Sequence, residues 1–132
     1  MEVIKENLIE TARKLYIEGG HSCSESVILA LKNHGIDIPD AILKSVSGLR
    51  TGIGGRGCIC GALMASVLVA GYLDKADISA DLHDKFKNQF KSTCCRVLTR
   101  KYDFKSKERK VFCAGLVEFM ICELQKILPH ER

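Results

Sequence analysis

The sequence predicts an all-α protein of one domain, with five or six helices packed around a central apolar helix at about residues 58–73. Apolar residues recur at intervals of three and four along most of the chain, which is the period of a helix with one buried face. No segment alternates convincingly between apolar and polar residues, as a half-buried strand does. The length of 132 residues, with 46% hydrophobic and 27% charged residues, suits a single globular domain covering residues 1–132.

Caps and glycines divide the N-terminal half into helices. A first helix is expected over residues 3–18, where apolar residues share one face, with Gly19 and Gly20 at its end. Ser22 and Glu25 have the spacing of a capping box, which predicts a second helix that reaches about residue 34. Pro39 leads into a short third helix at about 41–46. Five glycines within residues 48–57 then predict a loop, because so much glycine is costly in either regular structure.

The C-terminal half is predicted as three further helices. The fourth helix begins at Cys58 or Cys60, ends at Leu73 and is apolar on nearly every side, so we expect it at the centre. Ser79 is expected to cap a fifth helix that reaches about residue 102. Ser106 is expected to cap a sixth that reaches about residue 128 and is stopped by a proline at 129.

The fifth predicted helix carries two adjacent cysteines on different faces. Its main stripe includes Cys94 together with four apolar residues, Leu82, Phe86, Phe90 and Val97. Cys95 lies about 100° further round and shares a narrower face with Leu98 and Tyr102. If Cys95 is functional, another helix or a second subunit must cover this face, so the sequence allows a homodimer.

Cysteine number and the chain's apolar segments indicate a reducing compartment. The seven cysteines are odd in number, which does not suit a framework of paired structural disulfides. The first twenty residues carry acids and lack the apolar core of a signal peptide. The longest uncharged run, residues 57–73, is shorter than the roughly 18 to 20 apolar residues that span a bilayer. We therefore expect a cytoplasmic protein with reduced thiols and no membrane partner.

Positive charge is concentrated in one part of the chain. The formal net charge is +4, and residues 81–110 hold ten Lys or Arg against four Asp or Glu. Basic residues at helical spacing usually form the solvated face of a helix. Phe86 and Phe90, four residues apart, suit a core better than a platform for bases. No nucleic-acid partner is therefore expected.

Several cysteines fall at the predicted starts of helices. Cys23 lies in the first turn of the second helix, and Cys58 and Cys60 begin the fourth, where the partial positive charge of a helix N-terminus favours a thiolate. On the sixth helix Cys113 shares the core stripe, whereas Cys122 flanks the solvent side. Any one of them could be a small buried hydrophobe. Together, beside a glycine loop, they predict a composite site.

The glycine loop could add anion-binding groups, namely backbone N–H donors and arginine side chains, to that site. Its glycines spell G-x-G-x-x-G, but no predicted strand precedes them, as a dinucleotide fingerprint requires. Backbone donors at a helix start can still hold a small anion. The residues predicted to do so are Gly52, Gly54, Gly55 and Arg56, with Arg50 nearby. They would form a substrate pocket beside the thiols.

Of the four histidines, one lies close enough in sequence to a candidate cysteine to take part in its chemistry. His21 lies two residues before Cys23 and could lower the pKa of that thiol or donate a proton. His34, His83 and His130 are placed at helix or chain ends and are expected at the surface.

Five segments, spread over about residues 18–128, together resemble the C_GCAxxG_C_C family of redox-active proteins. They are His21–Val27, Ser47–Gly55, Cys60–Met64, Lys91–Leu98 and Cys113–Val117. Matched residue by residue, the resemblance implies that the functional set is Cys23, Cys60, Cys95 and Cys113. Ala65 stands where the family has a later glycine, and Cys58 and Cys94 are additional.

The resemblance leaves the chemistry open between several classes. Thiol–disulfide or electron-transfer chemistry, as an oxidoreductase or an electron-transfer component, would use an attacking cysteine and a resolving one, with a redox partner protein or a small thiol or anion. An iron–sulfur cluster would need the thiolates of Cys23, Cys60, Cys95 and Cys113 as ligands. Zinc is a weaker alternative because the usual C-x₂₋₄-C ligand pairs are missing. A non-catalytic interaction module with packed cysteines is the remaining class.

Overall fold

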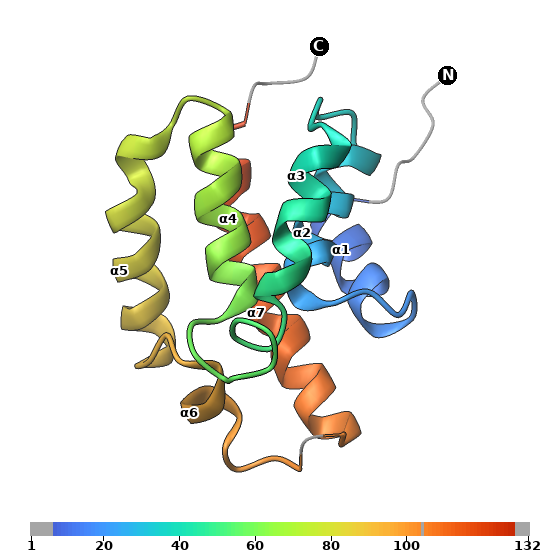
Figure 1. The fold of residues 1–132 in the computed structure, drawn as a ribbon, viewed down its shortest axis with the longest axis vertical. Coiled ribbons are helices and arrows are strands. Elements are labelled where there is room, and N and C mark those ends of the chain that lie inside the picture. Colours follow the sequence, from blue (N-terminus) through green and yellow to red (C-terminus); the bar gives the residue numbers. More distant parts are fainter. Residues whose placement is uncertain (1–6, 104, 129–132) are drawn as a thin grey trace.

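The computed structural model describes residues 7–103 and 105–128, and all the regular structure in these ranges is helical (Figure 1). The all-α prediction is confirmed. The α-helices are α1 (Leu8–Ile17), α2 (Cys23–Asn33), α3 (Asp40–Ser45), α4 (Gly61–Tyr72), α5 (Ser79–Phe90), α6 (Cys95–Thr99) and α7 (Lys107–Gln125). Two 3-10 turns, η1 (Val46–Leu49) and η2 (Ala76–Ile78), join α3 to the glycine loop and α4 to α5.

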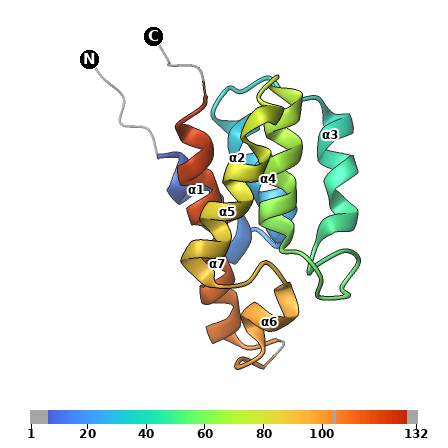
Figure 2. The same ribbon diagram turned by 90° about the vertical axis from the view of Figure 1, so that its left-hand side faces the viewer.

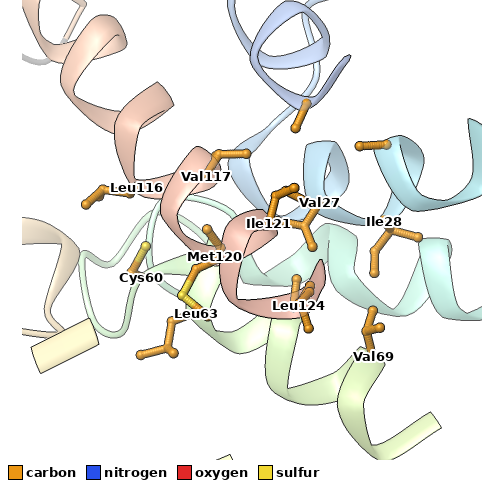
Figure 3. Packing of buried hydrophobic residues seen from close by; sticks show 14 of the residues in the cluster. Val27, Ile28, Cys60, Leu63, Val69, Leu116, Val117, Met120, Ile121 and Leu124 are labelled. Atoms are coloured by element: carbon orange, nitrogen blue, oxygen red, sulfur yellow. The ribbon is translucent and has the colours of Figure 1, made fainter. Parts of the chain in front are cut away.

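Helices α4 and α7 share the centre of the bundle. Helix α4 packs against α2, α5 and α7, while α7 also packs against α1 (Figures 1 and 2). Figure 3 shows Leu63 and Val69 of α4 in one cluster with Met120 and Leu124 of α7 and Val27 of α2. Burial of each such side chain contributes about 1.5–3 kcal/mol, so this cluster fixes the helices that carry the site.

The predicted central helix is not enclosed on every side. Leu68 and Tyr72 of α4 are 36% and 43% exposed. The apolar sequence of α4 therefore gives a helix that packs against three other helices and leaves one edge open to solvent. No helix within the described ranges combines the length and the apolar character needed to cross a membrane.

The starts of α2 and α7 follow the predicted caps, whereas Ser79, the predicted cap of the fifth helix, is the first residue of α5 and follows Ile78, which makes no side-chain capping hydrogen bond. Asn7 caps α1 by accepting a hydrogen bond from the Glu10 N–H at 2.8 Å; residues 3–6 of the predicted first helix lie outside the described residues. Both hydrogen bonds of the Ser22–Glu25 capping box form at the start of α2. Ser106 caps α7, which ends at Gln125; Pro129, predicted to stop it, is likewise outside the described residues.

The predicted fifth helix, 79–102, is wrong in its length, because the chain forms α5 and α6 with a break between them. Lys91 ends α5 in the left-handed region, with a φ of 74°. The chain then runs beside the glycine loop, where the carbonyl of Thr93 accepts the Cys60 N–H at 2.7 Å. The break also overturns the predicted stripe through Cys94, since Val97 is 44% exposed.

The glycine loop closes on itself through its own backbone. The N–H of Gly54 donates to the Gly48 carbonyl at 2.8 Å, and the N–H of Gly57 donates to Thr51 at 3.0 Å. At Gly52 the φ is +67° and a Cβ would collide with the backbone of Gly57 and Cys58. Glycine is therefore required there, and the predicted loop is confirmed.

Candidate functional site: a cysteine-lined pocket

A pocket of about 510 Å³ opens at the end of the bundle where α2, α4 and α6 begin. Its wall also includes the end of α1, the glycine loop and the first turns of α7. The loop, α6 and the start of α7 lie together at the lower end of the molecule in Figure 1. Four cysteines line this one pocket, namely Cys23, Cys60, Cys95 and Cys113. Folding thus brings the predicted set together, while the chemical role of these cysteines stays a prediction.

Local caps fix Cys23 at the pocket wall. Cys23 is the first residue of α2 and follows Ser22, whose hydroxyl accepts the Glu25 N–H at 3.2 Å. The Ser24 hydroxyl, fully buried, donates to the Val46 carbonyl at 2.8 Å and ties α2 to η1. The half-buried Cys23 side chain is therefore held between the α2 cap and the turn that precedes the glycine loop.

Gly61 lets the start of α4 approach Cys23. A Cβ on Gly61 would lie 2.7 Å from the Cys23 sulfur and 2.7 Å from the Leu49 carbonyl oxygen. Only a glycine allows this approach without displacing one of the two segments. Cys60, the residue before it, caps α4 through its backbone and lies at the edge of the core cluster in Figure 3.

Cys95 has a cationic neighbour. It begins α6 and is 9% exposed. The Arg109 guanidinium donates a hydrogen bond from Nη2 to the Cys95 sulfur, with 3.8 Å between the two atoms. A nearby positive charge stabilises a thiolate relative to a thiol. Helix α7 of the same chain packs against α6, and its Phe112 ring lies 5.4 Å from the ring of Tyr102, which follows the end of α6.

Cys113 combines burial with two polar neighbours. Burial raises the pKa of this thiol to about 11, against the opposing effects of the Arg109 charge and a hydrogen bond from Tyr16. The charges of Cys23 and Cys95 raise it further. Burial above all also raises the pKa of the Tyr16 hydroxyl, so the phenol stays protonated and can donate to the sulfur.

The expectation that helix starts favour thiolates at Cys23 and Cys60 is wrong for this arrangement. Burial raises the pKa of both thiols above the ordinary value of 9.0. Backbone N–H groups lower it in part, those of Thr51 and Ser24 for Cys23 and those of Leu63 and Ala62 for Cys60. Desolvation thus outweighs the helix N-terminus at both positions.

The pocket has a basic wall that the sequence predicts only in part: Arg50 is expected beside the thiols, whereas Lys105, Arg109 and Lys110 are expected on a solvated helix face. Arg50, Lys105, Arg109 and Lys110 line the pocket, and Lys110 also lies over the Tyr16 ring at 4.5 Å. Arg109 and Lys110 stand four and three residues before Cys113, so helical spacing alone could have placed them near that cysteine. No sequence signal connects Arg109 to Cys95 or Tyr16 to Cys113.

The predicted anion-binding loop reaches the pocket only in part. Gly54 and Gly55 line it, whereas Gly52 is buried within the loop and Arg56 is exposed outside the lining. The Arg56 carbonyl accepts a hydrogen bond from Arg96 at 2.9 Å. Any cationic contribution from the loop to the pocket therefore comes from Arg50.

The histidines and the remaining cysteines divide between the pocket and the surface. His21 lines the pocket beside Cys23, whereas His34 forms a hydrogen bond with Thr11 at 2.9 Å and His83 is exposed. His130 lies outside the described residues. Three cysteines lie away from the pocket lining: Cys58, Cys94 and Cys122. Cys122 is exposed, as its helical position predicts.

The four thiols do not form a metal-ligand set in this arrangement. Within residues 7–103 and 105–128, no three His, Cys, Asp or Glu side chains are grouped as metal ligands. An iron–sulfur cluster needs four thiolates that converge within a few ångströms, and zinc usually needs four ligands in a tetrahedron. The cysteines line one cavity, and ligation of a cluster or of zinc by them stays a prediction.

Comparison with known proteins gives one result. The family model described as "Putative redox-active protein (C_GCAxxG_C_C)" matches residues 21–127. No curated protein and no solved structure matches this chain.

Proposed function

Because this chain belongs to the C_GCAxxG_C_C family, we propose that it performs thiol–disulfide chemistry in the cysteine-lined pocket. The contact between Arg109 and the Cys95 sulfur carries the proposal. It places a guanidinium at hydrogen-bond distance from a pocket sulfur, and a cationic neighbour is a usual means of activating a cysteine.

The four pocket cysteines have different proposed roles: one attacks the substrate, one resolves the mixed disulfide, and two are further thiols in the wall. Cys95 is the attacking residue, because the Arg109 guanidinium already contacts its sulfur, and a cationic neighbour is a common feature of reactive cysteines. Cys23 is the resolving residue: its raised pKa keeps it protonated at neutral pH, and the charge of Cys95 is among the causes of that shift. Cys60 and Cys113 are more deeply buried and supply further thiols in the same wall.

The reaction balances as two successive exchanges with a small disulfide, RSSR. The Cys95 thiolate attacks one sulfur of RSSR, so that a Cys95–SR bond forms and RS⁻ leaves and takes a proton. Cys23 then loses its proton and attacks the Cys95 sulfur, which releases the second RSH and forms a Cys23–Cys95 disulfide. Two electrons pass from the protein to RSSR, and the reverse sequence reduces the protein.

The charge of the wall favours an anionic substrate. Four basic side chains line the pocket, and its one carboxylate, Glu25, already accepts the Ser22 N–H at 3.0 Å. A small disulfide or thiol that carries carboxylates would pair with this excess of positive charge. The volume of about 510 Å³ suits a molecule of that class.

The test uses reduced protein that carries the C58S and C94S substitutions. These remove the neighbouring thiols outside the pocket, so that a disulfide within one molecule reports on the pocket cysteines. Incubation with oxidised glutathione, which carries carboxylates, should remove two thiols per molecule and yield a Cys23–Cys95 linked peptide in mass spectrometry. The further substitution Cys95→Ser should abolish this loss. The matched control Cys122→Ser, on the exposed side of α7, should behave like its parent.

Three outcomes would overturn the proposal. Anaerobic purification that yields iron with acid-labile sulfide and visible absorption would replace the dithiol by a cluster. Slow and uniform labelling of all the cysteines only upon unfolding would favour an interaction module with packed thiols. A Cys95→Ser variant that keeps full exchange activity would show that the attacking residue is misassigned.

A further inference from the structure

Two cysteines outside the pocket lie against each other at its rim. The sulfur atoms of Cys58 and Cys94 are 3.9 Å apart, although the residues are 36 positions apart in the chain. Cys58 is exposed and Cys94 is half-buried, so both are open to reagents in solution. Neither residue lines the pocket, yet each lies within two positions of a cysteine that does, Cys60 or Cys95.

The backbone holds these two cysteines in place. The Cys60 N–H donates to the Thr93 carbonyl at 2.7 Å, and the Arg96 N–H donates to the Gly57 carbonyl at 2.9 Å. Gly57 precedes Cys58 and Thr93 precedes Cys94, so a hydrogen bond anchors the chain next to each cysteine. The Arg96 side chain adds a third contact, from Nη2 to the Arg56 carbonyl at 2.9 Å.

A disulfide needs about 2.05 Å between its sulfurs, so the two atoms must approach by about 2 Å. Rotation about the Cα–Cβ bonds of Cys58, which is exposed, and of Cys94, which is half-buried, can supply a movement of this size. At Gly57 a Cβ would lie 2.8 Å from Arg96, so glycine also permits the close approach of the two segments.

We propose that Cys58 and Cys94 are a second redox site, a rim dithiol that forms a disulfide by exchange with small disulfides in solution. The exposed Cys58 thiolate attacks RSSR and releases RSH; Cys94 then loses its proton, attacks the Cys58 sulfur and releases a second RSH. The protein loses two electrons, which reduce RSSR to two RSH. The exchange needs no pocket residue and is independent of the proposed function.

The rim disulfide controls access to the pocket. It joins the glycine loop covalently to the segment before α6, and these two segments carry Cys60 and Cys95 at their ends. Cys95 is 9% exposed, so its reaction with a bulky reagent needs a local opening of this region. A covalent link across the rim suppresses that opening, and we expect Cys95 to react at least about fivefold more slowly in the oxidised protein.

Peptide mapping tests the rim dithiol in the folded full chain treated with oxidised glutathione. Cys58 and Cys60 share one tryptic peptide, 57–75, and Cys94 and Cys95 share another, 92–96, so the linked pair is assigned by fragmentation and by variants. The link should persist in the C60S/C95S variant, which lacks two pocket thiols. It should be lost in the C58S/C94S variant, whereas C122S should retain it.

The outcomes separate this proposal from that of the pocket. A link between the two peptides that survives C58S/C94S would come from pocket cysteines and overturn the rim site. A link found only between two molecules on a non-reducing gel, or none at all in wild-type protein, would also overturn it. If C60S/C95S does not fold, as judged by circular dichroism, fragmentation of the wild-type peptides still identifies the bonded sulfurs.

Discussion

At the level of single residues, the reactivity of each pocket thiol depends on a balance between burial and a neighbouring charge. Burial raises the pKa of Cys23 and Cys60 although both stand at helix starts. Cys95 is also buried, but the Arg109 guanidinium donates to its sulfur. A full positive charge at hydrogen-bond distance has a larger effect than the partial charge of a helix end. This difference is the reason why we propose Cys95, among the four, as the attacking residue.

Removal of the charge beside Cys95 should slow its alkylation. In a C94S background, where peptide 92–96 holds one cysteine, Arg109→Gln should lower the rate of reaction with iodoacetamide at pH 7 by about tenfold, because less thiolate is present. Arg109→Lys should restore part of the rate. Arg100→Gln, at an exposed position after α6, is the matched control and should leave it unchanged. Equal rates in all variants would contradict the role of Arg109.

The buried thiol of Cys113 should make the protein less stable in alkali. Its pKa of about 11 in the folded protein exceeds the ordinary value of 9.0, so the unfolded chain loses this proton first as the pH rises. The stabilising difference is complete below about pH 9 and is lost between pH 9 and about 11. A shift of this size corresponds to about 2–3 kcal/mol.

Urea unfolding at pH 8 and pH 10.5 measures this contribution. Wild-type protein should lose more free energy of unfolding between the two pH values than Cys113→Ala does. Cys122→Ala removes an exposed thiol and should follow the wild type. If Cys113→Ala lost as much stability with pH as the wild type, this thiol would not be the group responsible.

At the level of the elements, small residues at helix starts decide how closely the cysteine-bearing segments approach. Gly61 begins α4 against the Cys23 sulfur and the Leu49 carbonyl oxygen. Gly71 lies in the last turn of the same helix, is exposed, and has no atom within 4 Å of a Cβ placed there. At Gly61 glycine is needed for close packing, whereas at Gly71 only its low helix propensity matters, so substitutions at the two positions test the two effects separately.

The variants Gly61→Ala and Gly71→Ala should have opposite effects on stability. Gly61→Ala forces α4 away from α2 or η1 and should cost about 1–3 kcal/mol. Gly71→Ala removes the entropic cost of glycine in a helix and should stabilise the protein by up to about 1 kcal/mol. Chemical denaturation measures both. A stabilising Gly61→Ala would show that the start of α4 has room that the structure does not show.

The break between α5 and α6 is also an effect of neighbouring elements. Residues 79–102 carry no proline or glycine, so local propensity alone favours one continuous helix. The chain instead turns at Lys91, where the carbonyl of Thr93 can accept the Cys60 N–H of the α4 start. This turn moves Cys95 into the pocket and Cys94 to its rim.

At the level of the whole molecule, the pocket is a region of positive charge built from distant parts of the chain. Arg50 follows η1, Lys105 precedes α7, and Arg109 and Lys110 belong to α7. The net charge of +4 adds to the attraction of an anion. Such attraction weakens as salt shortens the Debye length from about 30 Å at 0.01 M to about 8 Å at 0.15 M.

Exchange with disulfides should accordingly depend on substrate charge and on salt. Oxidised glutathione, which is anionic, should react faster than a neutral disulfide at 0.01 M salt, and the ratio of the two rates should fall several-fold at 0.15 M. Lys105→Gln should lower this ratio, because it removes a charge from the pocket wall. The matched control Lys87→Gln, at an exposed position on α5, should not. A ratio that is insensitive to salt would contradict an anionic substrate.

The sequence by itself determined the helical class, most of the helix starts and the loop. These features depend on neighbours in the chain: the Ser22–Glu25 box, the cap at Ser106, and the run of glycines that no helix tolerates. The inward direction of Cys113 and the outward direction of Cys122 follow from helical period alone. The resemblance to a family added the four cysteines as a set.

Only the tertiary structure decided which groups act on those cysteines. The raised pKa of Cys23 and Cys60 comes from solvent excluded by other segments, and Arg109 meets Cys95 across two helices. The contact between Cys58 and Cys94 likewise spans 36 positions. Burial and electrostatic interaction depend on distance in space, and no local pattern encodes that distance before the helices pack.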